Sequence, residues 1–312
     1  MTAIRKALAK CTPLKAAYHS LRSGAMSAVC HVSPELLTRL RYRATWGRWP
    51  DLENPVTFDE KLLWLNFHWR HPLKTECGDK YTLRGYVERL GLGQLLPRIY
   101  GVYESAEAID FGVLPQRFVL KCTHGCHCNV FCRNKTELDV PRARRDLTRW
   151  LATDYSTLMG ELHYAGMPPR ILCEEFLDDG TGESPTDYKL YCSNGHFHCT
   201  LVCSGRTPNG RADEDFFDRD WELLPYNQES LAAGRRIARP AAYEEMIVAA
   251  QRLSAPFPFV RVDFYCIQGR AVLGEMTFTP SACIDWTVTQ VGTRALGDFI
   301  ELPNKLLQPE RS

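Results

Sequence analysis

Two acids and an arginine lie in an otherwise apolar hairpin sequence near the C-terminal end of the chain. Apolar and polar residues alternate from Val260 to Tyr265, the pattern of a half-buried strand, and the polar positions include Arg261 and Asp263. A turn near Gly269 leads to a second strand that carries Glu275. Carboxylates are rarely kept in such surroundings unless they are paired or hold a metal ion.

The register of this hairpin decides whether the two acids can act together. A three-residue loop, Gln268 to Arg270, places Asp263 opposite Glu275, whereas a two-residue loop places it opposite Gly274. We predict the three-residue loop. Opposed carboxylates repel unless a cation lies between them, and hard oxygen ligands favour Mg²⁺ beside nucleotide phosphates. In the alternative, structural interpretation, Asp263 pairs with Arg261.

Three lysines occur in or beside apolar segments. Lys121 lies within the apolar run Phe118–Cys122, Lys189 lies within another predicted strand, and Lys80 lies in the first turn of a predicted helix. A buried lysine needs a partner, and a phosphate would serve. The small polar loop 123–129 follows Lys121 and could turn several backbone N–H groups toward phosphate oxygens.

The elements that would position these residues are short helices and strands. Ser33 and Pro34 predict one helix start, and Thr57 to Glu60 form the sequence of a capping box. Asn194–Gly195 predicts a tight hairpin. The expected strands are 98–102, 118–122, 130–133, 170–177, 187–192 and 196–203; the expected helices include 105–109, 140–153 and 240–253; and 205–220 is expected to be a surface loop.

Composition limits the class of protein. The chain has 312 residues, 45% of them hydrophobic, which suits one large or two closely packed domains. A net charge of +1 argues against general nucleic-acid binding. The sequence contains no run of 18 apolar residues, so we predict no transmembrane helix. The basic first 25 residues lack the apolar core of a signal peptide. We expect a helix docked on its own domain there; the alternative is weak contact with a membrane surface.

Cysteine is abundant, with 13 residues scattered through predicted core strands. This pattern suits reduced, buried thiols in a cytoplasmic protein. The denser cluster Cys122-Thr-His-Gly-Cys-His-Cys holds enough soft ligands for zinc, but no distant Cys/His pair completes a finger. A structural zinc site is therefore the less favoured interpretation.

Taken in order, these features resemble the ATP-grasp superfamily and, more closely, the TupA-like ATP-grasp family, named for a teichuronopeptide biosynthesis protein. The phrases that carry the resemblance cover about residues 50 to 285: Asn54-Pro-Val-Thr-Phe-Asp-Glu-Lys-Leu, Asp79-Lys-Tyr, Phe118-Val-Leu-Lys-Cys, Asp187-Tyr-Lys-Leu, Phe257-Pro-Phe-Val-Arg-Val-Asp-Phe and Gly274-Glu-Met-Thr-Phe-Thr-Pro. The resemblance implies an α+β fold in which two α+β lobes clamp ATP. It divides the chain into a helical N-terminal extension (1–50), the N-terminal part of the ATP-grasp domain (51–115), a lid lobe (116–177) and a C-terminal lobe with the metal site (178–312).

The resemblance also implies a role for each candidate site residue. Phosphate contacts would come from Lys80, Lys121 and Lys189, under a loop that includes His124, Gly125 and Asn129. Adenine would meet Glu174, Glu175, Phe176 and Leu177, and the ribose would meet Asp178 or Asp179. Asp263 and Glu275 would hold Mg²⁺, with Thr277 at the place of a third ligand. Arg261 would face the reacting carboxylate or acyl phosphate, and Lys189 would assist the transfer.

The function implied is an ATP- and Mg²⁺-dependent carboxylate–amine ligase that works through an acyl phosphate. The family name suggests that an amino acid is joined to a uronic acid in cell-surface polysaccharide biosynthesis. The partners would then be carboxylate and amine substrates, without nucleic acid. The alternatives are an ATP-dependent sugar kinase, a polysaccharide glycosyltransferase (a label that family members carry), or a non-catalytic module that binds nucleotide or zinc around Cys126, His127 and Cys128.

Overall fold

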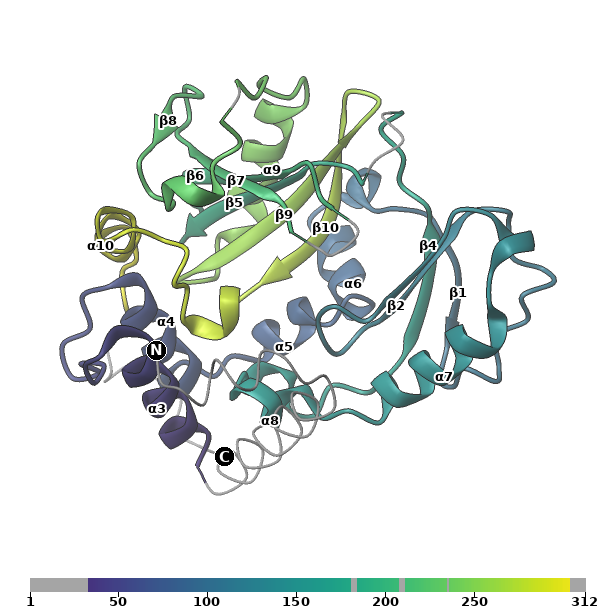
Figure 1. The fold of residues 1–312 in the computed structure, drawn as a ribbon, viewed down its shortest axis with the longest axis horizontal. Helices are drawn as coiled ribbons and strands as arrows, with labels where there is room; N and C mark the ends of the chain where they lie inside the picture. The colour runs from purple at the N-terminus through teal and green to yellow at the C-terminus, as the bar shows by residue number, and fades with distance from the viewer. Residues whose placement is uncertain (1–32, 181–183, 208–210, 235, 304–312) are drawn as a thin grey trace, which may run out of the picture.

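Two antiparallel sheets with helices packed around them form the protein (Figure 1). The computed structural model describes residues 33–180, 184–207, 211–234 and 236–303. The basic helix predicted within the first 25 residues lies outside these ranges. The mixed helix and sheet architecture confirms the predicted α+β class, while the predicted lobe boundaries stay a prediction.

The first sheet has four strands in the order β1-β4-β2-β3. Its apolar core contains Leu147 of α7 packed with Phe118 and Leu120 of β2. The elements are β1 (Ile99–Tyr103), β2 (Phe118–Cys122), β3 (Asn129–Cys132), β4 (Ile171–Glu175), α7 (Val140–Leu151), α8 (Tyr155–Met159), η2 (Lys135–Glu137) and η3 (Leu162–Tyr164). We refer to this part as the first lobe.

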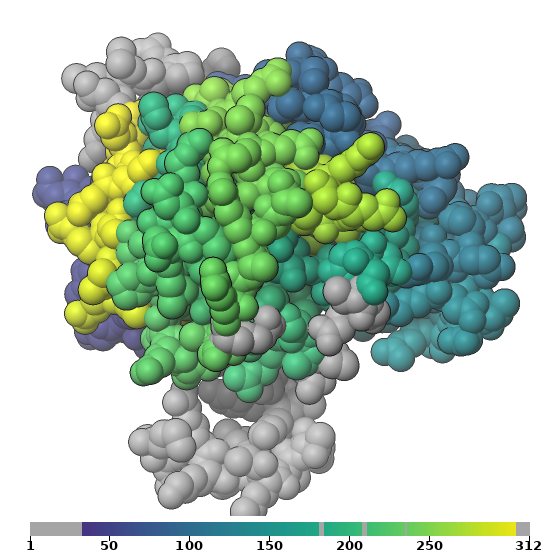
Figure 2. All heavy atoms as spheres, turned by 90° about the horizontal axis from the view of Figure 1, so that it is seen from above, coloured from purple at the N-terminus to yellow at the C-terminus, as the bar shows by residue number. Residues whose placement is uncertain are grey.

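The second sheet has six strands in the order β10-β9-β5-β6-β7-β8. One apolar core joins it to α6 and α9, and a second joins it to α4 and α10. The elements are β5 (Asp187–Ser193), β6 (His196–Ser204), β7 (Asp213–Phe217), β8 (Leu223–Leu224), β9 (Val260–Ile267), β10 (Arg270–Thr277), α3 (Pro34–Trp46), α4 (Phe58–His68), α5 (Pro72–Gly78), α6 (Thr82–Arg89), α9 (Tyr243–Ser254), α10 (Gln290–Phe299), η1 (Gly93–Leu95), η4 (Glu229–Leu231) and η5 (Pro280–Cys283). Figure 2 shows the yellow-green β10 between the green body of this second lobe and the blue and teal first lobe.

Local signals predicted several boundaries correctly. Ser33 caps α3, and Thr57 and Glu60 form the reciprocal capping box of α4. Asn194 and Gly195 both take positive φ, 48° and 79°, as a two-residue hairpin turn requires.

Two predicted elements are wrong, and Lys80 is displaced. Residues 105–109 form bends and a turn rather than a helix, and the carbonyls of Ala106 and Ile109 accept hydrogen bonds from Arg144. The expected loop 205–220 contains β7, which pairs with the edge of β6. Phe216 and Phe217, at the end of β7, are buried. Helix α6 begins at Thr82, so Lys80 precedes the helix instead of lying in its first turn.

The β9–β10 hairpin brings the two acids together by a different route from the one predicted. Its loop has two residues, Gln268 and Gly269, with φ of 52° and 78°, and not three. The ladder then shifts at Gly274, and this bulge restores the pairing of Asp263 with Glu275. The facing acids are therefore confirmed and the three-residue loop is wrong. A Cβ at position 274 would lie 3.2 Å from the Asp263 carbonyl oxygen, so glycine suits the bulge.

Candidate active site

Asp263 is the buried centre of a charge cluster on β9 and β5. Its carboxylate accepts hydrogen bonds from Arg261 Nε and Nη2, both at 2.8 Å, and lies 2.7 Å from Lys189 Nζ. Only 4% of Asp263 is exposed. The sheet itself fixes this geometry, because β5 pairs with β9 so that Lys189 stands directly opposite Asp263. In this state, Asp263 is thus paired as the structural interpretation proposed.

Glu275 is the more accessible of the two facing acids, with 37% of its side chain exposed. Lys80 Nζ lies 3.6 Å from its carboxylate, and the Thr277 hydroxyl donates to Oε1 at 3.2 Å. Burial alone would raise the pKa of Glu275, but four nearby cations, led by Lys80, lower the pKa to about 2. The carboxylate is therefore ionised and open to a further cationic partner.

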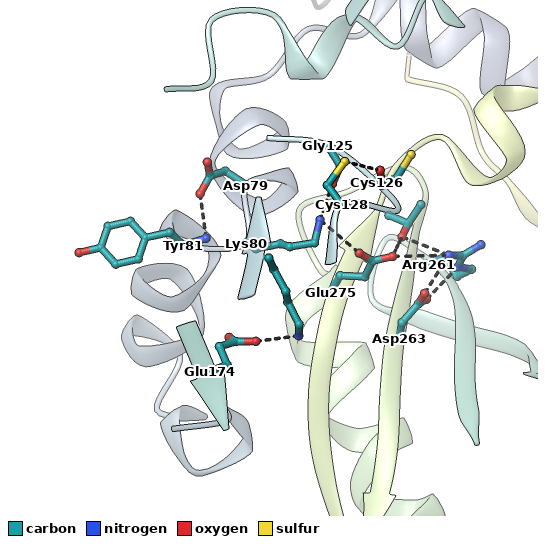
Figure 3. A network of polar contacts seen from close by, with 12 residues as sticks. Asp79, Lys80, Tyr81, Gly125, Cys126, Cys128, Glu174, Arg261, Asp263 and Glu275 are labelled. Carbon is teal, nitrogen blue, oxygen red and sulfur yellow. Dashed lines mark hydrogen bonds and ion pairs between the residues drawn. The ribbon is translucent and has the colours of Figure 1, made fainter. Parts of the chain in front are cut away.

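Lys80 joins the two lobes at this point. Its Nζ donates to the Gly125 carbonyl at 2.6 Å while facing Glu275, as Figure 3 shows. Its backbone N–H also donates to the Thr123 carbonyl at 3.2 Å. The Asp79 side chain points away from the cluster and caps the start of the following helix through Tyr81 N–H (Figure 3). One lysine therefore connects the loop of the first lobe to the acids of the second.

The loop after β2 is held against the first lobe by aromatic and sulfur contacts. A Cβ on Gly125 would come 2.5 Å from the Tyr155 ring, so only glycine fits there without displacement. The Tyr155 hydroxyl lies 2.5 Å from Cys128 Sγ. His124 is buried against the same ring, and burial lowers the pKa of its imidazole. Asn129 is the first residue of β3 and pairs with Lys121.

Lys121 forms an ion pair with the acid that sequence reasoning placed at the adenine. Lys121 Nζ lies 2.7 Å from Glu174, and Arg84 lies 3.5 Å from the other oxygen of that carboxylate. The Glu175 side chain accepts from Arg98 N–H at 2.8 Å. These contacts join β4 to β2 through Lys121, to α6 through Arg84 and to the residue before β1 through Arg98, so the two glutamates have structural partners in addition to any ligand.

The segment after β4 carries the remaining nucleotide candidates. Arg117 pairs with Asp178 at 2.6 Å and lies 4.5 Å above the Phe176 ring, and Arg133 lies 5.1 Å from the same ring. Leu177 is half-buried beside them. Sequence reasoning missed Arg84, Arg117 and Arg133, because isolated arginines in polar stretches carry no local signal.

The cysteine cluster does not assemble a metal site. Within the part of the chain that the structure describes, no group of three or more His, Cys, Asp and Glu side chains is arranged to hold a metal ion. Cys128 instead faces Tyr155, and Cys126 is exposed. Asp263 and Glu275 are two carboxylates only, which suits a cation that takes its other ligands from phosphates and water.

Comparison with known proteins places the chain in a family. The model of the TupA-like ATP-grasp family matches residues 60–301, while no curated protein matches the chain. Similar solved structures include D-alanine–D-alanine ligase from Bacillus anthracis (13% identity, TM-score 0.43, covering 72% of this chain and 66% of that one). D-alanine–D-alanine ligase from Helicobacter pylori has 16% identity and a TM-score of 0.40, and the match covers 72% of this chain and 61% of that one. L-amino acid ligase from Bacillus licheniformis has 13% identity and a TM-score of 0.43, and the match covers 70% of this chain and 48% of that one. The chain thus spans less than two thirds of the length of these proteins.

The family assignment rests on the match over residues 60–301, which confirms the resemblance inferred from the sequence. Among the described helices, none is long and apolar enough to cross a membrane. The chain belongs to the TupA-like ATP-grasp family.

Proposed function

We propose that the protein is an ATP- and Mg²⁺-dependent carboxylate–amine ligase that works through an acyl phosphate. The observation that carries this proposal is the cluster of Lys80, Lys121, Lys189 and Arg261 around the facing acids Asp263 and Glu275. Such a site suits phosphoryl transfer, which needs positioning and charge neutralisation more than acid–base groups.

The residues present fit a magnesium ion. Glu275 is ionised and partly exposed, Asp263 faces it across the ladder, and the Thr277 hydroxyl lies beside it. Oxygen donors of this kind, completed by phosphate oxygens and water, are the usual magnesium environment. Bound Mg²⁺ would neutralise charge on the transferring phosphate.

The chain's own cations would do the rest of the work. Lys121 would hold phosphate oxygens from the side of the first lobe, Lys189 would do so from the second, and Lys80 would do so from between the two. Arg261 already donates to Asp263 and Thr277, so a small rotation would present its guanidinium to a carboxylate or acyl phosphate. The γ-phosphate would pass to a carboxylate oxygen, giving acyl phosphate and ADP. An amine would then displace inorganic phosphate and form the amide.

For the nucleotide base, we propose the segment from Glu174 to Asp178. Phe176, held under two guanidinium groups, offers an aromatic surface at the end of β4. For the substrates, we propose an amino acid and a uronic acid of a cell-surface polysaccharide precursor, following the family name. The described cysteines are free thiols, which supports a reducing compartment such as the cytoplasm.

The test is ADP release from Mg²⁺-ATP with a panel of uronic acids, each with and without amino acids. ADP that needs both an acid and an amine supports the ligase. ADP with a sugar alone would favour the kinase instead. No ADP with any pair, together with no ATP binding in a titration, would contradict the proposal.

A further inference from the structure

Charge is divided very unevenly along the chain. The first 50 residues contain nine Lys and Arg residues but a single acid, Glu35, so they carry a net charge of +8. Because the whole chain carries +1, the other 262 residues together carry −7. A basic segment joined to an acidic body points to an anionic partner, either a nucleic acid or a membrane.

Helix α3 belongs to this basic segment, and it turns one apolar face to the outside. Leu37 and Tyr42 of the helix are buried against the rest of the protein. On another face, Leu36 and Leu40 are 44% and 43% exposed, and the exposed Ala44 continues the same stripe one turn further. Helix α3 lies at the lower left edge of the molecule in Figure 1. The spacing i, i+4 and i+8 therefore gives a continuous apolar stripe that faces outward.

Positive charge borders this stripe. Arg43 is exposed on the same face, and its guanidinium lies 4.7 Å from the ring of Trp49, which is 46% exposed. The acid of the segment, Glu35, pairs with Arg39 at 2.7 Å, and no carboxylate of the described residues pairs with Arg43. Ahead of α3, residues 1–32 contain five Lys and Arg residues and no acid. A guanidinium without an acidic partner in the described chain and an exposed indole thus flank the leucines.

This combination of apolar and positive groups matches the surface of an anionic bilayer. Leucine side chains enter the boundary of the acyl chains, arginine binds lipid phosphates, and tryptophan prefers the level of the headgroups. A nucleic acid would attract the same cations, but its phosphate backbone offers little contact for a stripe of leucines. A second copy of the chain would bring two segments of charge +8 together, which is unfavourable. The membrane is therefore the partner that suits both features.

We propose that the outward face of α3, with Leu36, Leu40, Arg43 and Trp49, docks on the surface of an anionic phospholipid bilayer. The helix would lie in the plane of the surface, and the five cations ahead of it would add attraction to the same lipids. Contact of this kind is peripheral and needs no membrane-spanning helix. The proposal does not depend on the ligase function, because none of these residues belongs to the candidate active site.

Vesicle sedimentation tests the choice of partner. The full-length protein is mixed with vesicles of phosphatidylcholine alone or of phosphatidylcholine with phosphatidylglycerol, and the bound fraction is measured over a range of lipid concentrations. Wild type should bind the anionic vesicles, and salt should weaken this binding. Binding to neither kind of vesicle, or equal binding to both, would overturn the proposal. Retention by duplex DNA without binding to vesicles would do the same and would identify nucleic acid as the partner.

Substitutions then test the contact through α3. The double variant Leu36→Gln, Leu40→Gln should bind the anionic vesicles about tenfold more weakly, because two apolar side chains are lost from the boundary. Arg43→Gln should bind about fivefold more weakly, the contribution of one cation near an anionic surface. The controls are Leu223→Gln, at a leucine that is 63% exposed, and Arg145→Gln, at an exposed arginine of α7. Both should bind as wild type does.

The urea midpoint of each variant shows that it is folded, and Arg43→Gln keeps the test open if the leucine variant is unstable. Unchanged binding in the folded α3 variants would overturn the proposal and would assign the binding to residues 1–32 alone. An equal loss in the α3 variants and in the controls would also overturn it, because binding would then depend on general charge and not on this face.

Discussion

Replacing Asp263 by asparagine removes the charge at the centre of the cluster and keeps its shape. The carboxylate receives two hydrogen bonds from Arg261 at 2.8 Å and lies 2.7 Å from Lys189, with 4% of the residue exposed. Removing one partner of a buried ion pair costs about 3–5 kcal/mol. The asparagine oxygen still accepts one bond, so we expect the free energy of unfolding to fall by about 3 kcal/mol, the lower end of that range.

The assay is urea unfolding of wild type, Asp263→Asn and the exposed control Asp220→Asn, with EDTA present and with or without ATP. Because phosphates supply the negative charge that the variant lacks, ATP should restore part of its stability. With Mg²⁺, the variant should release no ADP. A stability equal to wild type would refute the pairing of Asp263 with its two cations. Unchanged ADP release would refute its assignment to the metal.

Three further predictions concern other parts of the chain. Lys121→Met should raise the Kd for ATP by about tenfold in a binding titration, and an unchanged Kd in a folded variant would make Lys121 purely structural. Gly125→Ala would place a Cβ 2.5 Å from the Tyr155 ring, so it should lower stability to urea by about 1–3 kcal/mol, and Tyr155→Leu in the same chain should relieve the loss; no loss in the single variant would contradict the packing. Burial raises the pKa of Asp59 to about 7. Because the folded state favours its protonated form, the unfolding free energy should fall as pH rises from about 4 toward 7, and Asp59→Asn should flatten this slope in urea unfolding; a slope that persists would contradict the assignment.

Local chemistry made part of the fold predictable from the sequence. The capping box of Thr57 and Glu60 and the turn at Asn194–Gly195 depend on neighbours a few residues away, and both occur as predicted. The strand around Lys121 was predicted with its observed bounds, because a continuous apolar run is a strong signal.

The remaining features depend on contacts that no short stretch of sequence reveals. Lys80 meets Gly125 across 45 residues, and Thr279 meets Glu161 across 118. The roles proposed for the phosphate, adenine and metal residues stay predictions. In the structure many of these residues form ion pairs with one another.

The bulge at Gly274 decides which residues of the two strands lie opposite each other. The two-residue turn fixes the pairing at the tip of the hairpin, and the single extra residue shifts that pairing by one position before Asp263 and Glu275 meet. If Gly274 took a regular place in the ladder while the turn kept two residues, Gly274 would stand opposite Asp263 and Glu275 would turn to the other face. A three-residue turn without the bulge would pair Asp263 with Glu275 again in the same sequence. Turn length and a glycine at position 274 are thus two interchangeable ways of encoding the same pair of acids.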